Sequence, residues 1–460
     1  MSENKTNNLV YQIKDKPPIP QVILFALQQL LAILAATIAV PAIIGNGMSQ
    51  SAALFGAGAG TIIYQLFTRF RSPVFLGSSF AFLPSLFAAF AGAVSVQAGY
   101  AGLIIGAIFA GLVYVIISII VRFAGVAWID KLMPAVVIGP TVAIIGLSLA
   151  GNAIGDSLAG AYDADVQAYV MTPHVWVCFI CALITLFVVI LCATYGKKMT
   201  KLIPFIIGIV AGYIVAAIFT LIGSSSGNAD LQIIDFSLFE NMKWVPEFTF
   251  ITAIKGLKEL DGKYIASVAI AYIPVAFVAF AEHLADHKNL STIVGSDLTK
   301  DPGLHRTLLG DGVGSMVGAF FGGCPNTTYG ESIGCVAITR NASVVTILAT
   351  SIIAMVVSFF GPFVTFLATI PACVMGGVCI TLYGFIAVSG LKMLQKVDLN
   401  RNRNLFVAST ILISGIGGMA LSIGKITLTK VACSLILGII VNLVLSKKKD
   451  TEDDQPPLQK

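Results

Sequence analysis

The stretch of sequence that decides the fold is Gly322-Gly323-Cys324-Pro325-Asn326-Thr327-Thr328-Tyr329-Gly330-Glu331-Ser332-Ile333-Gly334. It lies within a strongly apolar chain, yet it carries a proline, several glycines, an asparagine, two threonines and a carboxylate. Pro325 disfavours helix at the residue before it and lacks a backbone N–H. Residues 326–328 suit an extended segment or a helix start. Regular helix is expected to resume near Glu331 and to run to about Arg340.

A helix that breaks at membrane depth needs new partners for its freed backbone groups. Such a break is tolerated only where protein or a water-filled cavity supplies those partners. The freed N–H groups and the positive end of the half-helix then point at whatever fills the cavity. We therefore interpret this stretch as half of a substrate site.

The composition is that of a polytopic membrane protein. Of the 460 residues, 57% are hydrophobic and 11% are charged, and the mean hydropathy is +0.91; soluble domains carry roughly 25% charge. Residues 1–20 are polar and lack a signal-peptide pattern, so the first apolar segment is expected to stay as a helix. Residues 447–460 are expected to be a disordered charged tail. The eight scattered cysteines are interpreted as small apolar filler rather than as a metal or disulfide site.

Fourteen apolar stretches are long enough to span a bilayer, allowing fewer than about 20 residues where a helix is broken. They lie near 21–44, 50–68, 74–93, 98–122, 132–152, 172–194, 202–223, 264–287, 305–323, 326–340, 344–367, 371–392, 403–423 and 427–446. With the N-terminus in the cytoplasm, most of the 28 Lys and Arg residues fall in cytoplasmic segments. The exceptions are Lys243, Lys255, Lys258, Lys263, Lys425 and Lys430. This pattern favours the count and places both termini in the cytoplasm.

The longest outer loop, 224–263, divides the chain into two sets of seven spans. Within it, Phe248–Leu260 is either a short interfacial helix or a solvated connector. An odd number of spans in each half is what an inverted repeat requires. The third span contains Phe75-Leu76-Gly77-Ser78-Ser79-Phe80-Ala81-Phe82-Leu83-Pro84, which is interrupted like the tenth. Two interrupted spans at matching positions point to a binding site at the midplane.

Ionisable residues inside spans are candidates for function because they are costly to bury. In the eighth span Glu282 and Asp286 share one helix face, and His283 and His287 form a second i, i+4 pair. Glu282 is expected to lie inside the membrane, whereas Asp286 is either inside or at the aqueous edge. The histidines are expected to be structural or solvated. No HExxH is present and a third ligand is lacking, so zinc is not expected.

Further candidates lie in and beside the tenth span. Glu331 is expected to be stabilised by the helix dipole and to face substrate. Asp311 is expected to form a hydrogen bond between helices, and Arg340 to reach the cytoplasmic interface. Phe80 and Tyr329 are the aromatic residues nearest the two breaks, where a ring can stack on a planar ligand.

Carboxylates, aromatic rings and free backbone amides together fit a small, flat, neutral ring with N–H donors and carbonyl acceptors. A pyrimidine or purine base has this chemistry. No Lys or Arg lies near either break, which disfavours an anionic substrate. A carboxylate buried away from water also holds a proton more readily, so we expect proton-coupled uptake.

These residues resemble the nucleobase–ascorbate transporter family (nucleobase–cation symporter-2), and within it the bacterial uracil permeases, over nearly the whole chain. The family signature reads here Glu331-Ser332-Ile333-Gly334 and then Thr339-Arg340. A Glu at its first position is similar to the uracil-type signature. Other matching runs are Gly77-Ser78-Ser79-Phe80-Ala81-Phe82, Ala281-Glu282-His283, Asp301-Pro302-Gly303-Leu304-His305-Arg306 and Val374-Met375-Gly376-Gly377.

The resemblance implies an all-α polytopic membrane protein with 14 transmembrane segments. They would form a 7+7 inverted repeat with short antiparallel β-strands in spans 3 and 10. It implies a core domain (21–125 and 264–368) and a gate domain (126–263 and 369–446), between cytoplasmic tails 1–20 and 447–460.

The resemblance also implies the roles of single residues. Glu282 and Glu331 would hydrogen-bond the base beside the backbone N–H groups of Phe80 and Gly330. Phe80 and Tyr329 would flank the ring. Ala36 would pack against the base, and Tyr383 would lie near the core–gate boundary.

The chain departs from the family pattern at three places. The first span has Gln28-Gln29 where Gln-His is usual, and Ser332 replaces a usual Asn. Asp286 stands where uracil permeases often have His, so either Asp286 takes over proton coupling or Glu331 carries the proton alone. Glu282 belongs to the same proton-coupling set.

The sequence thus predicts a uracil–proton symporter of the plasma membrane that works by alternating access. A xanthine or other purine permease of the same family is the nearer alternative, and an anion transporter or channel of the same architecture is the more distant one. A membrane enzyme is not expected, because the sequence lacks any nucleophile–base or metal motif. No cofactor and no nucleic-acid partner are expected; the partners are the nucleobase, the proton and the bilayer. Whether the chain forms a homodimer stays open.

Overall fold

The computed structural model describes residues 9–125, 128, 133–197, 199–240, 242–395, 397–423 and 426–446. The predicted tail 447–460, the first eight residues of the predicted tail 1–20, and Lys425 lie outside the described residues.

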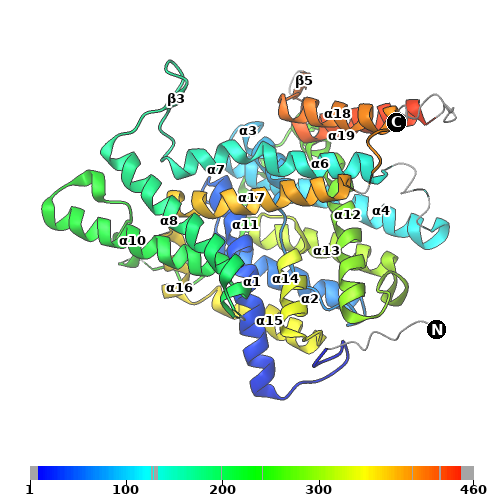
Figure 1. Ribbon diagram of the computed structural model, residues 1–460, viewed down its shortest axis with the longest axis horizontal. Helices are drawn as coiled ribbons and strands as arrows, with labels where there is room; N and C mark the ends of the chain where they lie inside the picture. The colour runs from blue at the N-terminus through cyan, green and yellow to red at the C-terminus, as the bar shows by residue number, and fades with distance from the viewer. Residues whose placement is uncertain are drawn as a thin grey trace, which may run out of the picture.

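Helices make up most of the molecule (Figure 1). In the first half of the chain they are α1 (Ile19–Ile44), α2 (Gln50–Phe67), α3 (Leu83–Ala91), α4 (Val96–Ala124), α6 (Ala135–Ser148), α7 (Ala150–Ser157), α8 (Pro173–Tyr195), α9 (Met199–Leu202), α10 (Pro204–Ser226) and α11 (Thr249–Gly256). In the second half they are α12 (Gly262–Val294), α13 (Leu304–Gly322), α14 (Gly330–Thr339), α15 (Val344–Val357), α16 (Gly361–Ala368), α17 (Ala372–Leu394), α18 (Asn402–Ile416) and α19 (Lys430–Leu445). Short helical turns are η1 (Phe80–Phe82), η2 (Ala229–Leu231), η3 (Phe236–Phe239), η4 (Leu257–Glu259) and η5 (Thr299–Gly303).

Every predicted apolar stretch contains helix. Within the described residues, 7 helices are long and apolar enough to cross a membrane, or up to 8 if the bent pair α15–α16 counts as one span. The polytopic membrane class is therefore confirmed. That all fourteen stretches cross the bilayer stays a prediction.

Two predicted spans differ from single helices. The stretch 344–367 bends by 82° between α15 and α16, where Gly361-Pro362 begins a new helix. The stretch 403–423 is helical only to Ile416, because Gly417 and Gly418 follow and Gly418 has a φ of 73°. The chain then forms a hairpin of β5 (Leu421–Ile423) and β6 (Ile426–Leu428) before α19.

The loop that is predicted to lie outside contains a helix, which is one of the two alternatives given for residues 248–260. Residues 249–259 form α11 and η4, and α11 packs against α4. A Cβ on Gly256 would lie 2.2 Å from the backbone of Gln97, so the two helices are in close contact. A solvated connector is therefore the wrong alternative for these residues. Elsewhere, β2 (Tyr162–Asp163) and β3 (Ala168–Tyr169) form a small hairpin.

The two interrupted spans meet through a pair of antiparallel strands, as predicted. β1 (Leu76–Ser78) pairs with β4 (Asn326–Thr328), with Gly77 opposite Thr327. The residue after each strand donates to the residue before the other strand: the N–H of Ser79 to the carbonyl of Pro325 at 2.9 Å, and the N–H of Tyr329 to that of Phe75 at 3.3 Å. The pairing satisfies backbone groups that the breaks release.

Glycines let α2 and α13 approach closely enough to hold this strand pair. A Cβ on Gly56 would lie 2.5 Å from the carbonyl of Gly318, and one on Gly60 would lie 2.6 Å from that of Gly314. Small residues at such spacing permit backbone contact between membrane helices. Asn326 at the start of β4 donates to the carbonyl of Gly56 at 3.2 Å, which ties the strand to the same helix pair.

Helix contacts in the two halves match one another. α1 packs against α14 and α15, as α12 packs against α3 and α4. α8 packs against α10 and α17, as α18 packs against α19 and α6. In Figure 1, α8 and α10 lie at the left edge and α18 and α19 at the upper right, while α6 and α17 run side by side between them.

The N-terminal segment and the end of α14 lie together. Arg340 follows α14 in a left-handed conformation with a φ of 55°. Its carbonyl accepts from the N–H of Val10 at 2.8 Å, and Ala342 donates to the carbonyl of Tyr11 at 2.9 Å. The start of α1 and the end of the tenth predicted span are therefore on one side of the molecule, as the predicted topology requires.

Candidate substrate site

A cavity of about 390 Å³ lies where α12, α14 and η1 face α6, α10 and α17. Three carboxylates line it, Glu282, Asp286 and Glu331, together with Phe80 and Gly330. The opposite wall is apolar and includes Val142, Phe205, Leu382, Phe385 and Ile386. No Lys or Arg is among the described residues of the lining.

The carboxylates reach the cavity from two helices. Glu282 and Asp286 are one turn apart on α12, and Glu331 is the second residue of α14. Like charges in an apolar wall without a cation are costly. The site therefore favours occupants that bring hydrogen-bond donors or protons to these oxygens.

Two helix starts converge on the same space. η1 begins at Phe80 and α14 begins at Gly330, and neither has a side-chain cap hydrogen bond. The first N–H groups of a helix have no partner inside the helix. Because β1 and β4 are antiparallel, these two sets of donors lie on either side of one strand pair. They can donate to carbonyl oxygens of an occupant.

Asp286 is tied to the strand pair. Thr328, the last residue of β4, donates to its carboxylate at 2.7 Å. Asp286 also lines the cavity, and this bond fixes the orientation of its carboxylate. Whether it lies inside the membrane or at the aqueous edge stays a prediction.

Two residues expected to touch the base lie outside the described lining. Tyr329 is only 4% exposed, and its hydroxyl donates to the carbonyl of Ser78 at 2.7 Å. Its ring covers Gly77, where a Cβ would lie 2.3 Å from the ring. Ala36 is buried in α1. Tyr329 therefore packs behind the breaks.

Phe80 also contacts the opposite wall. Its ring meets that of Tyr383 on α17 edge-on, with centroids 6.2 Å apart. Tyr383 was expected near a boundary between two parts of the molecule, and it contacts η1 from across the cavity.

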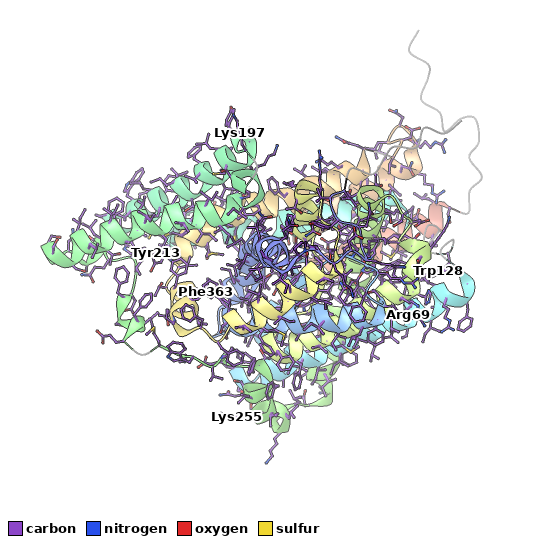
Figure 2. The ribbon with its side chains drawn as sticks, turned by 90° about the horizontal axis from the view of Figure 1, so that it is seen from below. Arg69, Trp128, Lys197, Tyr213, Lys255 and Phe363 are labelled. Carbon is purple, nitrogen blue, oxygen red and sulfur yellow. The ribbon has the colours of Figure 1, made fainter. Side chains whose placement is uncertain are left out.

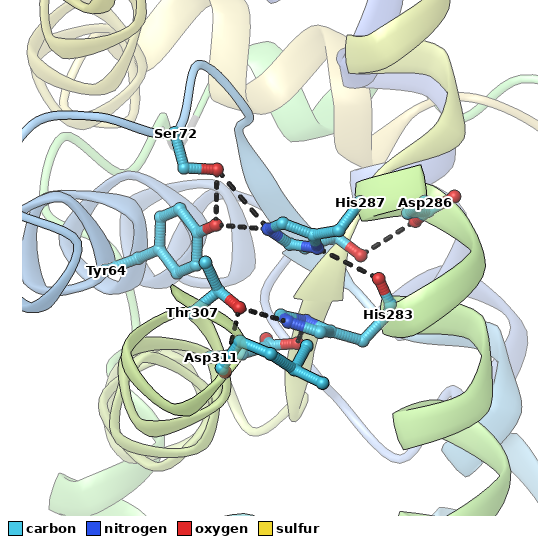
Figure 3. A network of polar contacts seen from close by, with 9 residues as sticks. Tyr64, Ser72, His283, Asp286, His287, Thr307 and Asp311 are labelled. Atoms are coloured by element: carbon cyan, nitrogen blue, oxygen red, sulfur yellow. Dashed lines mark hydrogen bonds and ion pairs between the residues drawn. The ribbon is translucent and has the colours of Figure 1, made fainter. Parts of the chain in front are cut away.

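The other face of α12 carries a buried polar network that the sequence indicated only in part (Figure 3). His283 lies 2.6 Å from Asp311 and 3.0 Å from Thr307, both on α13. The helix–helix hydrogen bond predicted for Asp311 is thus confirmed. His287 reaches Tyr64 of α2 at 2.8 Å.

Rings and hydroxyls complete this network. The two imidazoles stack with centroids 4.1 Å apart. The Tyr64 hydroxyl also donates to Ser72 at 2.7 Å. Both histidines are fully buried, so the structural alternative holds for them and the solvated one does not. The i, i+4 spacing placed them on one face, but no signal in the sequence indicated Thr307, Tyr64 or Ser72 as partners.

Counting protons shows that the network is neutral. His287 donates from Nδ1 to the carbonyl of His283 at 2.9 Å. Because Tyr64 gives its one hydroxyl proton to Ser72, Nε2 of His287 accepts the hydroxyl proton of Ser72 at 3.3 Å. Thr307 donates to the carbonyl of Leu304 at 3.0 Å, so it accepts from Nε2 of His283. One proton is then shared between His283 Nδ1 and Asp311 Oδ2. This arrangement avoids a net buried charge.

Comparison with known proteins places the chain among transporters. A model described as Permease family matches residues 20–424. The uracil permease of Bacillus caldolyticus is 38% identical over 444 residues, covering 95% of each chain. That of Bacillus subtilis (strain 168) is 37% identical and covers 99% of this chain and 98% of its own. That of Escherichia coli (strain K12) is 34% identical, and the match covers 94% of this chain and 93% of its own.

Solved structures share the fold at low identity. The transmembrane domain of the cyanobacterial bicarbonate transporter BicA superposes with a TM-score of 0.60 at 17% identity, covering 95% of this chain and 100% of that domain. The murine Slc26a9 anion transporter in its inward-facing state superposes with a TM-score of 0.64 at 13% identity, covering 94% of this chain and 69% of its own. At these identities the likeness is one of fold alone.

Proposed function

The chain belongs to the permease family, so it is a transporter of the cell membrane and not an enzyme, and we propose that it takes up uracil together with a proton. The observation that carries this proposal is the cavity, which combines carboxylates and helix starts without a side-chain cap, with no described Lys or Arg. Relatives that cover nearly its whole length are uracil permeases.

Uracil has the complementary set of groups. Its ring N–H groups donate to Glu282 and Glu331, and its carbonyls accept from the backbone N–H groups of Phe80 and Gly330. The Phe80 ring stacks on the base. Tyr329 assists from behind the strand pair, which it holds in place, and Ala36 supports the site from α1.

The coupling proton sits on the carboxylates of the cavity. Three acidic groups share a wall without a cation, so a bound proton relieves their repulsion. Glu331 and Asp286 are the proposed carriers beside Glu282. Thr328 keeps Asp286 oriented when uracil leaves.

Transport proceeds by movement of a core against a gate. The core comprises residues 21–125 and 264–368, and the gate comprises 126–263 and 369–446. The matched helix contacts of the two halves and the reciprocal strand bonds support an inverted repeat of seven plus seven spans. The cavity lies between these two groups of helices, as a moving boundary requires.

Uptake by proteoliposomes tests this function. Labelled uracil should accumulate when the outside is more acidic, and excess unlabelled uracil should compete while xanthine, hypoxanthine and bicarbonate should not. Competition by xanthine would indicate that the substrate is a purine instead of uracil. Accumulation that ignores the pH gradient would refute proton coupling.

Glu331→Gln separates binding from coupling. Gln keeps a hydrogen-bonding side chain but cannot carry the proton. We expect uptake to lose its dependence on the pH gradient, or uracil to bind at least about tenfold more weakly, as the loss of one charged hydrogen bond predicts. Glu240→Gln on the exposed outer loop is the matched control. Unchanged pH-dependent uptake would contradict the role of Glu331.

A further inference from the structure

We propose that a basic pocket at the end of α4 binds the phosphate headgroup of an anionic phospholipid. The pocket has a volume of about 430 Å³ and lies between α4, α12 and the start of α13. Arg122, Lys288, Lys300 and His305 line it. None of the described lining residues is acidic, which is the reverse of the substrate cavity.

The cations of this pocket have little compensation from the protein. Among the described residues, their one ion pair joins Lys300 to Asp297 at 3.5 Å. The nearby Asp301 is paired with Arg71 at 2.6 Å. Arg122 and Lys288 therefore add positive charge to a small volume, and an anion relieves their repulsion. A phosphate ester fits because it offers several acceptor oxygens to Arg and Lys together.

The surface beside the pocket points to a lipid as the source of that phosphate. On the turns of α4 before the pocket, Ile116 is 56% exposed, Ile119 is 52% exposed and Phe123 is 82% exposed. Such a ridge on a membrane protein faces acyl chains. Arg122 lies 5.8 Å from the centroid of the Phe123 ring, so the charge and the ridge adjoin. Basic pockets between membrane helices are sites for acidic lipid headgroups.

The position of Trp128 also indicates that the pocket lies at the level of the lipid headgroups. It lies at one edge of the molecule (Figure 2) and its indole N–H donates to the carbonyl of Gly125, which lines the pocket, at 3.1 Å. Tryptophan is enriched where headgroups meet acyl chains. The headgroup would thus occupy the pocket while its chains follow α4.

A bound lipid would join the end of α4 and the start of α13 to the side of α12, near the substrate site. Lys288 follows Asp286 by two residues on α12, while Arg122 and His305 come from α4 and α13. Binding to the folded state alone raises its stability by mass action. This inference needs membrane insertion but neither uracil binding nor proton coupling.

Thermal unfolding of purified protein in detergent tests the pocket. Phosphatidylglycerol should raise the midpoint by a few degrees, while phosphatidylcholine and inorganic phosphate should not. The triple variant Arg122→Gln, Lys288→Gln, Lys300→Gln should lose this shift. The control variant Lys255→Gln, Lys258→Gln, Lys263→Gln removes the same charge from exposed positions and should keep it.

Native mass spectrometry gives a second measurement if the triple variant does not fold. The single variant Lys288→Gln should retain fewer phosphatidylglycerol molecules than the wild type at the same lipid concentration. An equal number retained, or an unchanged shift in the triple variant, would overturn the site. An equal shift with inorganic phosphate would show that a soluble phosphate, and not a lipid, is bound.

Discussion

At the scale of single residues, neighbouring positions on α12 have opposite tasks because they face different surroundings. Glu282 and Asp286 line the cavity without a cation. His283 and His287, on the other face, are enclosed by α13 and α2 and satisfied by hydrogen bonds. The carboxylates of the first pair can still accept hydrogen bonds from the cavity, whereas the ring nitrogens of the second pair have partners within the protein.

Glu282→Ala should abolish detectable uracil binding while the protein still folds. The carboxylate is proposed to accept a ring N–H, and a hydrogen bond to a charged group contributes about 1.5–3 kcal/mol, or roughly tenfold to a hundredfold in affinity. Calorimetry in detergent measures it, with Glu240→Ala as control. Binding equal to that of the wild type would remove Glu282 from the site.

Removing the Asp311 carboxylate should lower the stability of the protein, because Asp311 shares a proton with His283. Asp311→Ala leaves Nδ1 of His283 buried without a partner, which costs about 1–3 kcal/mol. Asp311→Asn can still donate to that nitrogen and should retain most of the stability. Thermal unfolding compares the two variants. If Asp311→Ala and Asp311→Asn lower the melting temperature equally, a neutral hydrogen bond between His283 and residue 311 is not the source of the stability.

At the scale of elements, the two breaks depend on each other. Each strand has only three residues, and each satisfies the backbone that the other exposes. The prolines and glycines near them indicated where the helices stop, but only the pairing of β1 with β4 fixes the register. That register brings the starts of η1 and α14 to one cavity.

Gly77→Ala should disrupt this crossing. The new Cβ would lie 2.3 Å from the ring of Tyr329 and would push it from the Ser78 carbonyl. Overpacking of this kind costs about 1–3 kcal/mol, and uracil binding should fall with it. Gly384→Ala on α17 is the control, since a Cβ there meets nothing within 4 Å. A Gly77→Ala protein with normal melting and binding would contradict the coupling of the breaks.

At the scale of the whole molecule, the cavity belongs to neither half of the chain. Its acidic wall comes from α12 and α14, whereas its apolar wall comes from α6, α10 and α17. Under the proposed movement of core against gate, a site divided in this way would open as the two groups of helices separate. The ring contact between Phe80 and Tyr383 is one of the links between them.

Tyr383→Ala should therefore slow transport more than it weakens binding. An aromatic pair contributes about 0.5–1.5 kcal/mol, so losing this contact should lower the rate of uptake by up to roughly tenfold. Uracil affinity in detergent should change less than uptake. Tyr195→Ala, on an exposed part of α8, serves as control. Affinity and uptake falling in parallel would place Tyr383 in the binding site instead.

The sequence by itself determined the membrane class, the positions of the helices, both breaks and the acidic residues of α12 and α14. These features follow from local rules, because apolar length, proline and buried charge act within one segment. Tertiary structure alone decided the partners of the two histidines and which expected residues reach the cavity. Each of these depends on what another segment presents, as Tyr329 turning to Gly77 and Asp311 meeting His283 illustrate.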